Sequence, residues 1–388
     1  MPIGFGTLTL LVLAGLGGPL LALVGRRFVP VVVGELLAGI LLGPAVLGEV
    51  NPAGAIVSML GEVGFAMLML TVGMHLPLRE RRLGAALREG FLLAAIVGVL
   101  AIPGGMLAAL VAGGGHAAVY AVVLASGSAA VLLPALQEAH LESPSVTVLM
   151  AQVAIADVVT IVSVPIVLQP GRLGHALLGG LLVAATAAAL LVAALWLARR
   201  AWVHEVRRRS KQRHWALDLR LSLLVLFLLA WLAQNGGTSV LIAGFSAGLM
   251  VAVIGGPKRL STQVRGIADG FFVPLYFVVL GARLDLGGLL AHPELCALAG
   301  ALAAVSLAIH LLAAALLRRP PAAALAASAQ LGVPAAVASL GLSEHVLSAT
   351  TATAIVVSAL ISLAICSSGV ARLARAGAAG EVGGAATA

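Results

Sequence analysis

The chain is divided into apolar runs of about 17–26 residues, and short polar segments, most of them rich in arginine, separate these runs. About 20 apolar residues are enough for a helix to cross a bilayer. In lipid every backbone polar group needs a partner within the protein, so such runs form helices. The chain is 61% hydrophobic and 10% charged, whereas soluble domains are about 45–50% apolar and 25% charged. The sequence therefore predicts an all-α polytopic membrane protein.

The number and direction of the spans follow from the apolar runs and the basic residues between them. Basic residues follow every odd-numbered run except the fifth, and the opposite side carries only Arg172 and Arg283. Because cytoplasmic loops are enriched in Lys and Arg, this pattern predicts 13 transmembrane helices in the inner (cytoplasmic) membrane of a cell, with the N-terminus outside and the C-terminus in the cytoplasm. Basic side chains confined to loops also argue against a nucleic-acid partner and leave membrane lipid as the surroundings. The predicted spans are 5–24, 29–48, 55–76, 88–111, 117–137, 145–168, 174–198, 216–234, 238–254, 267–284, 294–317, 321–342 and 346–371.

A faint internal repeat has an offset of about 205–208 residues. Ala38–Gly43 parallels Ala243–Gly248, and Val72–Leu76 parallels Leu280–Leu284. Spans seven apart cross in opposite directions, so the repeats are inverted, as in many secondary transporters. The alternative is that apolar segments rich in Gly and Ala match by chance. We expect one transmembrane domain over 1–375, with repeat one at about 5–168, a linker helix at about 174–198, repeat two at about 216–373, and a disordered tail at 376–388.

Helix-breaking residues interrupt two spans at corresponding positions of the two repeats. Gly127 lies between Ser126 and Ser128 in the fifth span, and Gly332 and Pro334 interrupt the twelfth. Glycine loosens a helix and proline removes a hydrogen-bond donor. Paired discontinuous helices point to an ion site near the midplane, where Ser126 and Ser128 offer oxygen atoms to a cation. The alternative for each break is a packing kink.

Asp157 is the acidic residue that lies deepest in an apolar run. A carboxylate near the bilayer centre costs about 2.5–3.5 kcal/mol on insertion scales, and intramembrane acids usually bind ions or relay protons. Thr160 lies one turn further on the same face, and Gln152 precedes Asp157 by five residues; both are candidate ligands, with interhelical packing as the alternative. Glu35, near the inner end of the second span, is predicted to bond a neighbouring span.

These segments together resemble the monovalent cation/proton antiporter family, in particular NapA-type sodium/proton exchangers and the membrane domains of potassium-efflux antiporters. The second span, Pro30–Pro44, looks like the family signature, and Ala125–Ser128 looks like its unwound crossover helix. Phe271–Gly281 followed by Leu284–Leu286 is also typical. The resemblance covers residues from about 5 to 373.

The resemblance implies an elevator mechanism, in which a core of spans 4–6 and 11–13 carries the ion past a dimerisation domain of a homodimer. It implies that Asp157 binds a proton or a cation, Na⁺ or K⁺, by turns. Ala156 stands where relatives have Asp, Asn or Gln, and His310 stands where many have Lys or Arg facing the aspartate. His310 is thus either a proton-linked partner or a hydrogen-bonded core residue. With one carboxylate for both ions, we expect one-for-one, electroneutral exchange.

Other functions remain open at the level of sequence. A solute or organic-anion symporter would fit the broken helices but fits the single aspartate less well, and a passive cation channel fits the repeat poorly. An intramembrane aspartyl protease needs two deep carboxylates, a metalloprotease needs a His-Glu-x-x-His motif, and a serine protease would have to rely on Ser126 or Ser128. We therefore expect a transporter and no enzyme, with no cofactor, no metal beyond the transported cation and no nucleotide-binding domain in the tail.

Overall fold

The computed structural model describes residues 5–24, 31–74, 83–141, 143–169, 171, 173–213, 215–236, 239–254 and 258–385. The basic residues of the first two inner loops, Arg26, Arg27, Arg79, Arg81 and Arg82, and also Arg172, lie outside these ranges. The first part of the chain forms α1 (Phe5–Gly15), α2 (Gly17–Val24), α3 (Val31–Leu42), α4 (Ala55–Met74), α5 (Leu83–Val111), α6 (Ala117–Ala125), α7 (Ala129–Glu138), α8 (Pro144–Leu168) and α9 (Leu173–Ala198).

The second part of the chain is also helical. Ten helices of the described residues are long and apolar enough to cross a membrane, and α3 and α12 are shorter apolar helices. Each predicted span coincides with helix, but thirteen crossings stay a prediction. The remaining elements are α10 (Ala201–Gln212), α11 (Leu217–Asn235), α12 (Val240–Ile254), α13 (Lys258–Ile267), the π-helix η2 (Ala268–Phe272), α14 (Val273–Arg283), α15 (Leu286–Ala291), α16 (Pro293–Leu316), α17 (Pro321–Ala327), α18 (Gly332–Ser343) and α19 (Ala349–Ala385).

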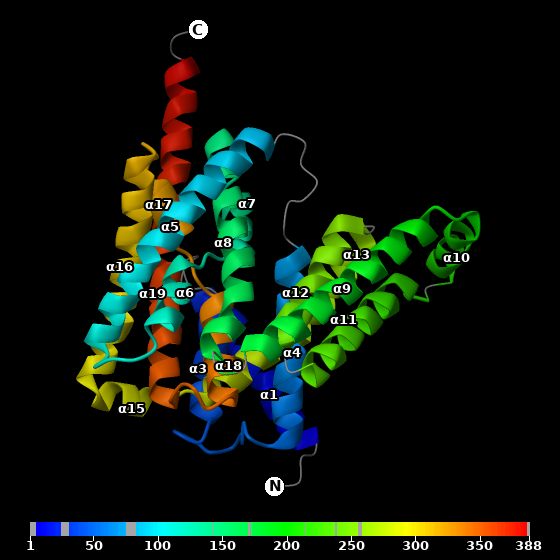
Figure 1. Cartoon of the computed structure of the whole chain (residues 1–388), viewed down its shortest axis with the longest axis horizontal. Coiled ribbons are helices and arrows are strands. Elements are labelled where there is room, and N and C mark those ends of the chain that lie inside the picture. Colours follow the sequence, from blue (N-terminus) through cyan, green and yellow to red (C-terminus); the bar gives the residue numbers. More distant parts are fainter. Residues whose placement is uncertain are drawn as a thin grey trace.

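The helices form two groups that lie side by side. Helices α5, α6, α7, α8, α16, α17 and α19 make up one group, and α9, α10, α11, α12 and α13 make up the other (Figure 1). The C-terminal end of α16 and the last part of α19 lie toward the upper end in this view, and α10 lies at the far right. The ion pair between Arg319, just after α16, and Glu89 of α5 also ties the start of α5 to this end. The common placement agrees with a shared cytoplasmic face, which stays a prediction.

Two close glycine contacts occur in two helix pairs that the predicted repeat relates to each other. A Cβ on Gly39 of α3 would lie 3.0 Å from the Cα of Gly281 on α14. A Cβ on Gly73 of α4 would likewise lie 3.0 Å from the Cα of Gly248 on α12. Small residues let helix backbones approach in this way. An offset of about 205–208 residues maps α3 onto α12 and the end of α4 onto α14, so the two helix pairs correspond. Gly39 itself maps to residues 244–247, within about one turn of Gly248, and the inverted repeat stays a prediction.

Two helices are interrupted, one of them at a slightly different place from the prediction. The backbone is extended at Ser126 and Ser128, around Gly127, between α6 and α7. The second break covers residues 328–331, so Gly332 and Pro334 lie in the first turn of α18 rather than within the break. Proline is tolerated in the first turn of a helix, because its missing N–H has no intrahelical partner there. These residues therefore start a helix instead of interrupting one.

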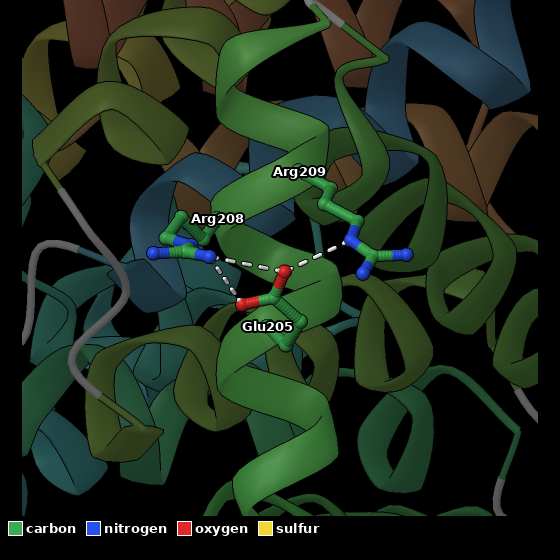
Figure 2. Close-up of polar contacts among 3 residues, drawn as sticks. All are labelled: Glu205, Arg208 and Arg209. Atoms are coloured by element: carbon green, nitrogen blue, oxygen red, sulfur yellow. Dashed lines mark hydrogen bonds and ion pairs between the residues drawn. The ribbon is translucent and has the colours of Figure 1, made fainter.

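Two segments predicted as irregular are helical. Residues 376–385 of the predicted disordered tail continue α19, although this stretch contains as many glycines, which are poor helix formers, as alanines. The basic loop after α9 forms α10, where Glu205 accepts hydrogen bonds from Arg208 at 3.2 Å and Arg209 at 2.9 Å (Figure 2). Acid–base pairs three and four residues apart support a helix.

Large apolar side chains cover the outside of several helices. Exposed examples are Phe91 and Leu110 on α5, Leu178 on α9, and Leu224 and Trp231 on α11. Water would disfavour so much exposed apolar surface, whereas lipid or a second apolar chain would cover it. The fold is thus that of a multi-pass membrane protein, and several of its buried polar residues, among them Ser126, Ser128 and Gln330, lie at the two helix breaks.

Candidate functional site

Asp157 lies in the middle of α8 and points at the start of another helix. It is 3% exposed, and its Oδ2 accepts a hydrogen bond from the backbone N–H of Ala129 at 2.9 Å. Ala129 is the first residue of α7, directly after the break. The free N–H groups and the dipole of a helix N-terminus favour a negative charge. The broken helix therefore provides the deep carboxylate with a polar partner.

The first break places the predicted residues Ser126, Gly127 and Ser128 next to α8. The Ser126 hydroxyl donates to Val123 O at 2.7 Å, at the end of α6. Ser128 occupies the N-cap position of α7 but makes no side-chain capping bond, since Asp157 supplies the acceptor instead. A Cβ on Gly127 would lie 2.9 Å from Val153 Cγ1 of α8. A small residue at this position lets the extended segment pack against α8 close to Asp157.

Thr160 is buried one turn after Asp157. Its hydroxyl donates to Ala156 O at 2.6 Å and lies 3.3 Å from Asp157 O. The proton of the hydroxyl is thus directed to its own helix, and the lone pairs of the oxygen remain available to a cation. Its role as a ligand stays a prediction.

Gln330 in the second break joins three elements of the site, a connection that sequence reasoning missed. Its Nε2 donates to Ser306 Oγ of α16 at 2.8 Å and to Leu124 O of α6 at 3.4 Å. Its backbone N–H donates to Ser362 Oγ of α19 at 3.1 Å. The Leu124 carbonyl belongs to the C-terminal turn of a half-helix, where carbonyl groups lack intrahelical donors. A polar residue in an otherwise apolar run beside a break was the available signal.

His310 and Gln152 line one small pocket between α5, α8, α16 and α17. The pocket has about 20 Å³ for water-sized molecules, which is room for about one water. Nδ1 of His310 is 2.8 Å from Ser306 O of its own helix. Among the hydrogen bonds of the described residues, none joins His310 to Asp157. The structure therefore places His310 with Gln152 and Ser306, and a direct pairing with Asp157 stays a prediction.

A tyrosine connects the second broken helix to the neighbouring helix α14. The Tyr276 hydroxyl donates to Ala335 O of α18 at 2.9 Å, and its ring stacks on Phe65 of α4 with centroids 5.2 Å apart. By the resemblance, α4 and α14 belong to the dimerisation domain and α18 to the core. The bond is then a contact between the two expected domains.

Asp157 is the buried carboxylate at the first helix break. Within the described ranges, no group of three or more His, Cys, Asp or Glu side chains could hold a metal ion. The family model for the transmembrane region of sodium/hydrogen exchangers matches residues 8–376. The chain belongs to this family. Its members are transporters, not enzymes, and they form part of the monovalent cation/proton antiporters.

Individual relatives agree with this assignment. A probable Na(+)/H(+) antiporter, GerT of Bacillus cereus, is 24% identical over 67% of this chain and 69% of its own length. The Na(+)/H(+)-K(+) antiporter GerN of the same organism is 24% identical over 67% of each chain. The sodium proton antiporter MjNhaP1 of Methanocaldococcus jannaschii has a similar fold, with a TM-score of 0.63, 18% sequence identity and coverage of 95% of this chain and 98% of its own.

Proposed function

We propose that this exchanger moves a monovalent cation, Na⁺ or K⁺, in one direction and a proton in the other, with Asp157 as the binding group for both. The observation that carries the proposal is the position of the Asp157 carboxylate at the start of the interrupted helix α7. Similarity to GerT and GerN supports the ion class, since one is named for Na⁺ and the other for Na⁺ and K⁺.

The chemistry needed is competition at one carboxylate. The α7 N-terminus stabilises the ionised form, and the oxygen atoms of Ser128 and Thr160 are candidate ligands for a cation that has lost its water. A proton bound to Asp157 removes the charge that holds the cation. Either ion then satisfies the buried carboxylate, whereas the empty charged form is costly in a medium of low dielectric. That difference favours movement of the loaded site and gives obligatory exchange by alternating access.

We further propose electroneutral, one-for-one exchange. Ala156 offers no second acid beside Asp157, and the described hydrogen bonds of His310 and Gln330 link them to Ser306 rather than to Asp157. One carboxylate then carries one cation or one proton per half-cycle. A homodimer with an elevator-like core movement follows from the family resemblance, and the exposed apolar faces of α9 and α11 are available to lipid or a second subunit.

Proteoliposomes that enclose a pH-sensitive dye provide the test. Added Na⁺ or K⁺ should drive proton movement in the wild type, Asp157→Asn should abolish it, and the exposed-site control Glu62→Gln should retain it. Insensitivity of the rate to an imposed membrane potential supports electroneutrality. Cation-independent uptake of a solute, with unchanged activity in Asp157→Asn, would instead support a symporter and overturn the proposal.

A further inference from the structure

Glu35 of α3 is a buried acid that the exchange reaction described above does not use. Its side chain is 3% exposed although α3 is a short apolar helix, and its Oε2 is buried with no hydrogen-bond partner among the protein atoms. The sequence predicted that Glu35 bonds a neighbouring span, and this oxygen makes no such bond. An unpaired, ionised carboxylate oxygen in an apolar interior is one of the most costly arrangements in a protein.

The helix next to Glu35 is packed too closely to bring in a positive side chain. A Cβ on Gly18 of α2 would lie 2.9 Å from Glu35 Cγ, and a Cβ on Gly17 would lie 3.2 Å from Gly34 O. The described parts of α1 and α2 contain no charged residue. The backbone of α2 therefore occupies the space through which a side chain of α2 would have to reach Glu35.

The charged groups on the described neighbouring elements do not bond the buried oxygen of Glu35. On α14, which packs along α3, the single basic residue is Arg283, and it donates to Ser58 Oγ at 3.1 Å and to Pro52 O at the far end of that helix. On α13, Arg265 is exposed and Arg259 is half-buried, and Asp269 of η2 is exposed. None of the described residues donates a hydrogen bond to Glu35 Oε2.

We propose that Glu35 holds a proton and is a second proton-binding site of this exchanger, separate from Asp157. A proton is the ligand that fits, because it neutralises the buried oxygen without needing a cavity or further ligands. The inference concerns the protonation state of Glu35 and does not depend on which cation is exchanged.

Loss of the proton would place a negative charge where helix backbones touch. Gly34 contacts α2, and Gly39, one turn and a half further along α3, contacts Gly281 of α14. Because these contacts cannot relax by side-chain movement, charge on Glu35 would separate α3 from its neighbours. Proton occupancy of Glu35 is thereby linked to the packing of α3 against α2 and α14.

A carbodiimide provides a direct test on the full-length protein, since this reagent modifies protonated carboxyl groups in apolar surroundings. The reaction is run in an Asp157→Asn background, so that ion binding at Asp157 does not alter the result, and the modified peptides are identified by mass spectrometry. We expect labelling of Glu35 at neutral pH that is unchanged by Na⁺ or K⁺. Labelling should disappear in Glu35→Gln and remain in the control Glu62→Gln, whose exposed carboxylate is bonded by Gln234.

Two results would overturn the proposal. Absence of Glu35 labelling at neutral pH would show an ionised or inaccessible carboxylate, and infrared spectra separate these cases because a protonated acid has its own carbonyl band, which Glu35→Gln should remove. Loss of labelling on addition of Na⁺ or K⁺ would show that a cation, not a proton, occupies the site. If exchange fails in the wild type but Glu35 labels as expected, the proposed transport function is wrong and the second proton site stands.

Thermal stability provides a second readout that does not depend on reagent access. Glu35→Gln keeps the shape of a protonated glutamic acid, so we expect its unfolding temperature near neutral pH to be close to that of the wild type. Raising the pH should destabilise the wild type more than the variant, since only the wild type gains a buried charge. A variant that is much less stable at every pH would show that Glu35 is ionised and paired in the native protein, and the proposal would fail.

Discussion

The backbone N–H of Ala129 donates to Asp157 Oδ2 at 2.9 Å, across 28 positions of the chain. Ala129 is the first residue of α7, where the fixed φ of proline is tolerated, but the Cδ atom of its ring would replace the amide proton and displace the Asp157 carboxylate. The relationship makes one hydrogen bond to the proposed ion site accessible to substitution without changing the carboxylate itself.

We predict that Ala129→Pro weakens the ionised form of Asp157, because it removes the N–H donor and places a ring carbon beside the carboxylate. A hydrogen bond to a charged group contributes about 1.5–3 kcal/mol, so protons should compete better with the cation and the pH profile of exchange should move about one to two units higher. Ala130→Pro, in the same first turn, is the matched control because it leaves the Ala129 amide in place. Identical profiles for the two variants would show that the Ala129 bond does not act on the site.

Gln330 should position the two broken helices. Gln330→Leu removes the donors to Ser306 Oγ and Leu124 O and leaves those acceptors buried, at a cost of about 1–3 kcal/mol each where water cannot replace the donor. We expect a lower unfolding temperature and a lower maximal exchange rate, with a smaller change in apparent cation affinity. Ser306→Ala, which removes one of the two contacts, should have an intermediate effect. Wild-type rates in Gln330→Leu would contradict this role.

Tyr276 should stabilise the conformation that the structure shows. Tyr276→Phe removes the hydrogen bond to Ala335 O but keeps the ring that stacks on Phe65. Loss of about 0.5–1.5 kcal/mol shifts a two-state equilibrium by roughly two- to tenfold. We therefore expect a change in exchange rate of up to about that factor, in a protein that still folds. Phe65→Leu tests the ring contact alone, and a change in Phe65→Leu with wild-type rates in Tyr276→Phe would assign the stabilisation to ring packing instead of the hydrogen bond.

The α10 cluster predicts a pH effect that is separate from transport. Hydrogen bonds from Arg208 and Arg209 lower the pKa of Glu205 below its usual value. A lowered pKa means that the contribution is present above the unfolded value and is lost as the pH falls through the folded one. Glu205→Gln should thus differ slightly in thermal stability from the wild type at neutral pH, and not in acid. Because Glu205 is at the surface, salt should reduce the difference, and exchange activity should be unchanged.

The apolar runs, the deep aspartate and the regions of the two helix breaks follow from the sequence, because they depend on local composition and on the length of a membrane span. The exact start of α18 could not be predicted from the sequence, since Gly332 and Pro334 are compatible both with a break and with a first helical turn. Helix α10 was also missed. Its apolar content is low, and its stability depends on acid–base pairs, which the length of an apolar run does not indicate.

The contacts between residues far apart in the chain were decided by tertiary structure alone. Asp157 meets the N-terminus of α7, Gln330 joins α6, α16 and α19, and His310 lies with Gln152 and Ser306. The sequence by itself determined a membrane-embedded chain with one deep acidic residue, since a charge inside a long apolar run can be recognised from the order of residues alone. The resemblance of its motifs indicated an exchanger. Which helix end receives that charge, and that an oxygen of Glu35 is left without a partner, depend on how helices pack, and no local pattern specifies this.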